Sequence, residues 1–150
     1  MCRLRCAVVS VLFLFAPLTV FAGPAEEAGA VIERWVAAFS ANEADTVVKL
    51  YTTDATLLGT VSPILSEGTE AIGGYFSRLP GSGFKVVLGE RRLVVLSDAA
   101  VLGTGFYEFS RMQDGKTVLT PARFSIVVEK RGGEWLIVHH HSSARPKPPQ

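Results

Sequence analysis

Four long apolar segments, separated by short turn sequences, fill the C-terminal half of this 150-residue chain. The separators are dipeptides that favour tight hairpin loops, Ser97-Asp98, Asp114-Gly115 and Gly132-Gly133. The segments between them predict four consecutive antiparallel strands, at residues 84–96, 99–110, 117–130 and 134–143. A chain of this length forms one domain, which excludes a Rossmann enzyme or a full-size barrel.

Helical periodicity marks the N-terminal half. Residues 25–40 carry an apolar stripe with helical spacing, and a second, short helix is expected at residues 43–51. Residues 52–58 are predicted to form a short strand, and a third helix begins within residues 66–69. Helices followed by an antiparallel meander predict an α+β fold, in which a curved antiparallel sheet wraps around three N-terminal helices.

The predicted strands are apolar at both odd and even positions. Helices cover only one face of such a sheet, so a second copy of the protein is the simplest cover for the other face. We therefore expect a homodimer or a larger homo-oligomer. Strand alternation places Phe124, Ile126 and Val128 on one face, which we predict packs against the second subunit. His139 and His141 would lie at or near this interface.

Residues 1–22 are typical of a secretory signal peptide. Arg3 and Arg5 precede an uninterrupted apolar run at residues 7–15. This run is shorter than the roughly 20 residues that a bilayer-spanning helix needs. We expect cleavage before Gly23, a periplasmic or secreted mature protein, and no membrane association after cleavage.

Residues 23–143 are predicted to form the folded domain, and residues 144–150 a Pro-rich tail. The formal net charge of +1, without a lysine and arginine cluster, excludes nucleic acid as an expected partner. Both cysteines lie within residues 1–22, so the predicted mature chain has no thiol nucleophile and no thiolate metal ligand.

The run His139-His140-His141 contains all three histidines of the chain. In a strand, His139 and His141 share one face and His140 takes the other. A zinc or iron site needs a further ligand, commonly a carboxylate, and the sequence offers no suitably spaced partner. We therefore predict no metal and no cofactor.

Arg123 is the one charged residue in the apolar stretch from Thr120 to Val128. Burial of a guanidinium group requires a carboxylate, a ligand anion or water. Two interpretations stay open: a structural pair with an acid such as Glu108, or a ligand-binding role. Several aromatic residues could line an apolar pocket or simply fill the core: Trp35, Phe39, Tyr51, Tyr75, Phe76 and Phe106. We predict that Arg123 points into a cavity that it shares with Trp35 and Phe106.

Several segments resemble a known family over nearly all of residues 25–147. They are Tyr51-Thr52-Thr53-Asp54-Ala55, Glu67-Gly68-Thr69-Glu70-Ala71-Ile72, Asp114-Gly115, Thr120-Pro121-Ala122-Arg123-Phe124 and residues 133–143. They resemble the association (hub) domain of calcium/calmodulin-dependent protein kinase II and its bacterial relatives in the SnoaL-like, nuclear-transport-factor-2-like superfamily. The resemblance implies a cone-shaped fold of the cystatin-like type, with a pocket between sheet and helices and dimerisation through the outer sheet face.

The resemblance also implies site residues. Arg123 matches an arginine of the hub pocket, whereas Phe106, Ser142 and Ile72 stand where the hub has its other polar pocket groups. The match at Ser142 puts His140 on the pocket side. The ligand-binding candidates are therefore Arg123, Trp35, Phe106, Tyr51 and His140.

The functional expectation is an exported, hub-like domain that self-associates and binds a small organic molecule in a conical pocket without catalysis. The superfamily includes ketosteroid isomerase, but Gly59 and Trp35 stand at its base and tyrosine positions, so isomerase chemistry is not expected. Two alternatives stay open. One is a SnoaL-like enzyme that acts on a small hydrophobic metabolite with Arg123 and a histidine, and the other is a purely structural assembly module.

Overall fold

A computed structural model describes residues 22–147 of the protein. The predicted signal peptide, apart from its last residue, and the last three residues of the predicted tail lie outside the described residues. The elements run in the order α1 (Pro24–Ala41), α2 (Ala44–Val48), β1 (Tyr51–Leu58), β2 (Leu65–Glu67), α3 (Gly68–Phe76), β3 (Lys85–Ser97), β4 (Ala100–Gln113), β5 (Lys116–Arg131) and β6 (Glu134–Ala144). The predicted α+β class is confirmed, and β2 is an additional short strand.

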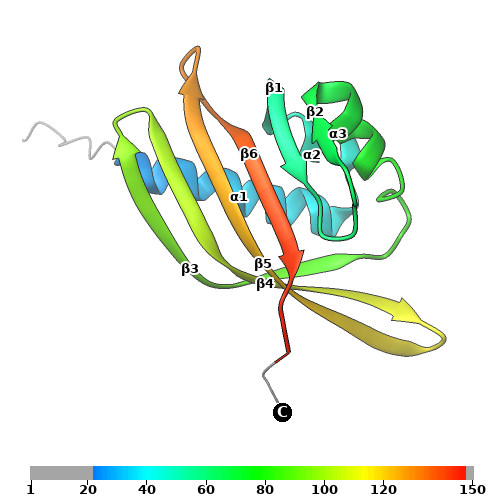
Figure 1. The fold of residues 1–150 in the computed structure, drawn as a ribbon. Coiled ribbons are helices and arrows are strands. Elements are labelled where there is room, and N and C mark those ends of the chain that lie inside the picture. The colour runs from blue at the N-terminus through cyan, green and yellow to red at the C-terminus, as the bar shows by residue number, and fades with distance from the viewer. Residues whose placement is uncertain (1–21, 148–150) are drawn as a thin grey trace, which may run out of the picture.

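The strands form one curved sheet in the order β2-β1-β6-β5-β4-β3. All neighbours are antiparallel except β1 and β6, which are parallel, so the predicted antiparallel sheet is wrong at this one pair. Helix α1 crosses one face of the sheet, and α2 and α3 lie toward its β1–β2 edge (Figure 1). The hairpin between β4 and β5 extends beyond the body of the sheet (Figure 1).

Irregular pairing and glycines bend the sheet around α1. The register of β3 on β4 shifts between Leu88 and Arg91, as expected for a bulge, which strengthens local twist and curvature. On β4, a Cβ at Gly103 would lie only 2.6 Å from Ile32 Cδ1 of α1. A side chain at residue 103 would displace the Ile32 side chain, so the glycine lets α1 pack close to the strand.

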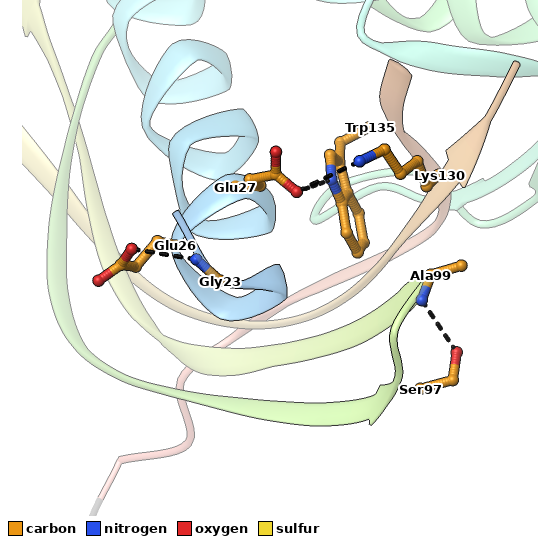
Figure 2. Close-up of polar contacts among 7 residues, drawn as sticks. All are labelled: Gly23, Glu26, Glu27, Ser97, Ala99, Lys130 and Trp135. Atoms are coloured by element: carbon orange, nitrogen blue, oxygen red, sulfur yellow. Dashed lines mark hydrogen bonds and ion pairs between the residues drawn. The ribbon is translucent and has the colours of Figure 1, made fainter. Parts of the chain in front are cut away.

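The first turns of α1 are attached to the sheet by polar contacts (Figure 2). The indole N–H of Trp135 donates to Glu27 Oε2 at 2.7 Å, and Lys130 Nζ lies 3.5 Å from the same oxygen. The ammonium group of Lys130 also lies 5.8 Å from the centre of the Trp135 ring. These contacts orient α1 across β5 and β6.

The inner face of β5 carries Phe124, Ile126 and Val128, which are 4%, 0% and 0% exposed in the core under the helices. The prediction that this face packs against a second subunit is therefore wrong. Alternation correctly grouped the three residues, but both faces of β5 are apolar, and the sequence pattern does not distinguish the face that meets the helices. His139 and His141 lie on the opposite, outer face, where they pair with Val127 and Ser125.

The outer face of the sheet carries its own apolar row. Val94 of β3 pairs with Leu102 of β4, which pairs with Val127 of β5. Val94 is 39% exposed, and Leu102 and Val127 are partly exposed. The described helices lie on the other side of the sheet, so this row has no cover within the described chain (Figure 1). None of the helices within residues 22–147 combines the length and apolarity needed to cross a bilayer.

Candidate functional site

A cavity of about 480 Å³ lies between the inner sheet face and the helices. Six elements and the segments that connect them contribute residues to its lining. The lining residues are Trp35 and Phe39 of α1, Leu57 of β1, Tyr75 and Phe76 of α3, Tyr107, Phe109 and Arg111 of β4, Val118 and Thr120 of β5, and His140 and Ser142 of β6, with Gly59, Thr60, Val61, Arg78, Leu79 and Phe84 from the connecting segments. The wall is largely aromatic, as is typical of sites that hold small organic molecules.

Trp35 is the centre of the aromatic wall. Its ring is stacked on Phe39 and Tyr107, with centroids 5.2 and 6.1 Å apart, and meets His140 edge-on at 5.0 Å. Trp35 is 2% exposed, so its position is fixed by packing on several sides. The wall is therefore preformed rather than assembled around a ligand.

Behind this wall, buried polar groups form a hydrogen-bonded chain. Trp35 Nε1 donates to Tyr51 Oη at 2.9 Å, and Tyr51 Oη lies 2.8 Å from His140 Nδ1. The other ring nitrogen of His140, Nε2, lies 3.3 Å from Tyr107 Oη. The hydroxyl groups of Thr60 and Ser142 bond to each other at the same end of the cavity. Within the described residues, each buried side-chain nitrogen or oxygen atom at the inner end of the cavity thus has at least one hydrogen-bond partner.

Burial keeps the ionisable members of this chain neutral. Desolvation, with smaller contributions from His139 and His141, lowers the pKa of His140 to about 3. Desolvation also raises the pKa of Tyr51 and of Tyr107 well above the usual tyrosine value. Near neutral pH the site therefore contains one neutral imidazole between two neutral phenols.

Positive charge is confined to the open rim of the cavity. Arg78 and Arg111 line the cavity and are both exposed. The guanidinium of Arg111 lies 5.2 Å from the centre of the Phe84 ring and donates to Gln113 Oε1 at 3.0 Å. Within residues 22–147, neither arginine forms an ion pair with a carboxylate. Both cations are available to an anionic group at the rim.

The predicted placement of Arg123 and Phe106 in a cavity with Trp35 is wrong. The two residues pair across β4 and β5 on the outer sheet face, where they line a separate, shallower cavity of about 330 Å³. Arg123 Nε donates to Ser143 Oγ at 3.1 Å, and the guanidinium of Arg145 lies 4.3 Å from the centre of the Phe106 ring. Arg123 is exposed, so its charge needs no buried partner.

The open alternative of an Arg123–Glu108 pair also finds no support, since no ion pair joins these residues in the described chain. The other three candidates lie on the inner side. Trp35 and His140 line the cavity, and Tyr51 lies behind them as the hydrogen-bond partner of both. Whether they bind a ligand stays a prediction.

Sequence reasoning missed Tyr107 and the hydroxyl groups of Thr60 and Ser142. Tyr107 follows Phe106 directly, and strand alternation therefore puts it on the inner face once Phe106 is known to point outward. The two rim arginines carried no such signal, because Arg78 follows α3 and Arg111 lies near the tip of the β4–β5 hairpin. No group of three or more potential metal ligands occurs in the part of the chain that the structure describes.

The chain is similar to proteins of a known family. The sequence profile of the family described as calcium/calmodulin-dependent protein kinase II association domain matches residues 24–146. A solved association domain from Xanthomonas campestris is 36% identical, with a TM-score of 0.75, and the match covers 81% of this chain and 88% of that chain. No protein with a curated description matches the sequence.

More distant solved structures share the fold. The association domain of calcium/calmodulin-dependent protein kinase II from C. elegans is 21% identical, with a TM-score of 0.66, over 77% of this chain and 91% of that chain. A nuclear-transport-factor-2-like protein with a cystatin-like fold, from Novosphingobium aromaticivorans, is 15% identical, with a TM-score of 0.68, over 79% of this chain and 80% of that chain. The family match over residues 24–146 shows that the chain belongs to the calcium/calmodulin-dependent protein kinase II association domain family.

Proposed function

We propose that this protein is a self-associating domain that binds a small, mainly apolar molecule in its inner cavity. The observation that carries the proposal is the cavity itself, which has a volume of about 480 Å³, an aromatic wall and few polar groups. Arg78 and Arg111 at the rim favour ligands with an acidic group at the outer end. The ligand class is therefore a small organic acid with an apolar body, or an apolar compound of similar size without the acidic group.

Binding rather than catalysis fits the state of His140. A general base needs a ring nitrogen that can accept a proton near the working pH. Both ring nitrogens of His140 face tyrosine hydroxyl groups, and its pKa is about 3. The alternative of an enzyme that pairs Arg123 with a pocket histidine requires both groups in one cavity, but they line opposite sides of the sheet.

The ligand proposal is tested with 2-naphthoate and naphthalene, which share an apolar body and differ in the carboxylate. We expect both to bind the purified protein, and we expect the double variant Arg78→Gln/Arg111→Gln to bind naphthoate several-fold more weakly with naphthalene unchanged. Arg92→Gln, on a strand away from the cavity, is the matched control. Failure of both compounds to bind in calorimetry would overturn the proposal.

Self-association is supported by the uncovered row of Val94, Leu102 and Val127 and by the membership of an association-domain family. We propose that this outer face packs against a second copy, in an isologous interface. Val127→Glu should yield a monomer with an unchanged circular dichroism spectrum. The neighbouring Ile126→Glu, in the core, should prevent folding. A monomeric wild type in light scattering at micromolar concentration would contradict the proposal.

We also propose that the protein is exported and cleaved before Gly23. The nitrogen of Gly23 lies 3.2 Å from Glu26 Oε2 at the start of α1 (Figure 2). Cleavage would convert this nitrogen into an ammonium group, and Glu26 would then offset its charge at the helix N-terminus. N-terminal sequencing of the protein from the periplasm or medium should begin at or near Gly23. Recovery of Met1 on most of the protein would refute the export proposal.

A further inference from the structure

The buried hydrogen-bonded chain behind the cavity has a fixed direction. Its first member, the indole N–H of Trp35, is a donor only, so Tyr51 Oη must accept from it. The single proton of Tyr51 then goes to His140 Nδ1, the other partner of this hydroxyl among the described residues. A donor-only group at one end thus sets the orientation of the next two hydrogen bonds.

The same reasoning fixes the tautomer of His140. A neutral imidazole that accepts at Nδ1 carries its proton on Nε2. Nε2 faces Tyr107 Oη at 3.3 Å, so Tyr107 accepts from His140 and retains its own proton for another partner. Every hydrogen bond in the chain therefore points from Trp35 toward Tyr107.

Tyr107 ends this chain in a corner with two further hydroxyl groups, those of Thr60 and Ser142, which bond to each other. We refer to Tyr107, Thr60 and Ser142 as the hydroxyl corner. All three residues line the cavity. Each contributes one hydrogen, but the oxygen of Tyr107 already accepts from His140. The hydroxyl corner therefore holds one more hydrogen than its own acceptors take up.

We propose that the hydroxyl corner donates this surplus hydrogen bond to an acceptor oxygen of the ligand. The inference rests on the proposed ligand-binding function and specifies its ligand class. The ligand is a small, mainly apolar compound whose inner end carries a carbonyl or another oxygen without a proton. The chain behind Tyr107 strengthens the donor, because successive hydrogen bonds polarise one another. A ligand without such an oxygen leaves a buried donor unpaired.

Acetophenone and ethylbenzene form a matched pair of probes, because they have similar size and shape and differ in the carbonyl group. Both are neutral, so the rim arginines do not separate them. Tyr107→Phe removes one of the three hydroxyl groups of the hydroxyl corner and disconnects the other two from His140, so the remaining donor loses the chain that orients and polarises it. Thr104→Val is the control, since it removes a hydroxyl group from the outer face of β4, away from the cavity. Calorimetry gives the dissociation constants, and infrared spectroscopy gives the carbonyl stretch of bound acetophenone.

We expect the carbonyl stretch in the wild type to lie below its value in hexane. In Tyr107→Phe the stretch should return toward that value, and acetophenone should bind about tenfold more weakly, while ethylbenzene binding is unchanged. Thr104→Val should match the wild type. Binding of both probes without a shifted stretch, or a stretch that Tyr107→Phe leaves unaltered, would overturn the inference and leave the proposed function intact.

Failure of both probes to bind would instead overturn the proposed function and the inference together. A second measurement tests the direction of the chain without any ligand. Nitrogen-15 NMR of the wild type should show a protonated Nε2 and an unprotonated Nδ1 for His140. The opposite tautomer would overturn the inference even if both probes bind.

Discussion

Acidification should destabilise this protein through His140, well above the pH at which most carboxylates titrate. The pKa of His140 is about 3 in the folded protein, against an ordinary value of 6.5 in the unfolded chain. Below about pH 6.5 the unfolded state therefore binds a proton that the native state excludes. Stability is highest above this pH and falls as the pH decreases toward 3.

The magnitude follows from the separation of the two pKa values. Each pH unit between them costs about 1.4 kcal/mol from this single group, so a change from pH 6.5 to pH 4 removes about 3 kcal/mol. This is a large part of the 5–15 kcal/mol that is typical of a domain, so acid unfolding is expected near pH 4 in modest urea.

Urea unfolding at pH 7, 6, 5 and 4 measures this effect. His140→Gln lowers stability at neutral pH, because it disturbs the contacts to Tyr51 and Tyr107, but its stability should depend less on pH than that of the wild type. His141→Gln, at an exposed position, is the comparison variant. His141 makes only a small contribution to the low pKa of His140, so the slope should stay close to that of the wild type. If the free energy of unfolding falls by the same amount from pH 7 to pH 4 in the wild type and in His140→Gln, the reasoning is refuted.

Three further substitutions test the packing. Gly59→Ala should lower the free energy of unfolding by about 1–3 kcal/mol, because its Cβ would overlap the Tyr75 ring. Gly73→Ala lies within α3, where the new methyl group has open space around it, and it should raise the free energy of unfolding by about 0.5–1 kcal/mol. A stabilised Gly59→Ala or a destabilised Gly73→Ala would contradict the packing described above. Glu27→Leu should cost about 1–3 kcal/mol in urea unfolding, since the largely buried Trp135 N–H loses its acceptor, and an unchanged midpoint would show that this contact contributes little.

The fold was predictable from the sequence because its signals are local. Turn dipeptides and helical spacing identify segments of ten to twenty residues, and the family resemblance supplies their arrangement. The side of the sheet that each residue faces was not predictable for β5. Alternation correctly separated Arg123 from Phe124, but both sets of positions in this strand are apolar enough to face a core. Helix α1, which ends 75 residues before β5 begins, decides between them.

The candidate site was only partly predictable for a similar reason. Trp35 and His140 were found from their residue types and from the resemblance. Their connection through Tyr51 to Tyr107 joins positions on α1, β1, β4 and β6, and no spacing rule links such distant positions. The hydroxyl corner requires the curvature that brings β4 and β6 together, and this curvature emerges only in three dimensions.

The parallel pairing of β1 with β6 has a consequence for how the domain folds. Tyr51 lies beside Ile137, so this contact must close a loop that contains most of the domain, whereas the hairpins from β3 to β6 close short loops. Loop closure of this length is slow relative to hairpin formation. The meander should therefore form first, and β1, β2 and α3 should dock on β6 last. This docking also closes the cavity, so a bound ligand would stabilise only the state in which β1 is paired with β6. Unfolding begins with the separation of β1 from β6, and a bound ligand would therefore slow this step.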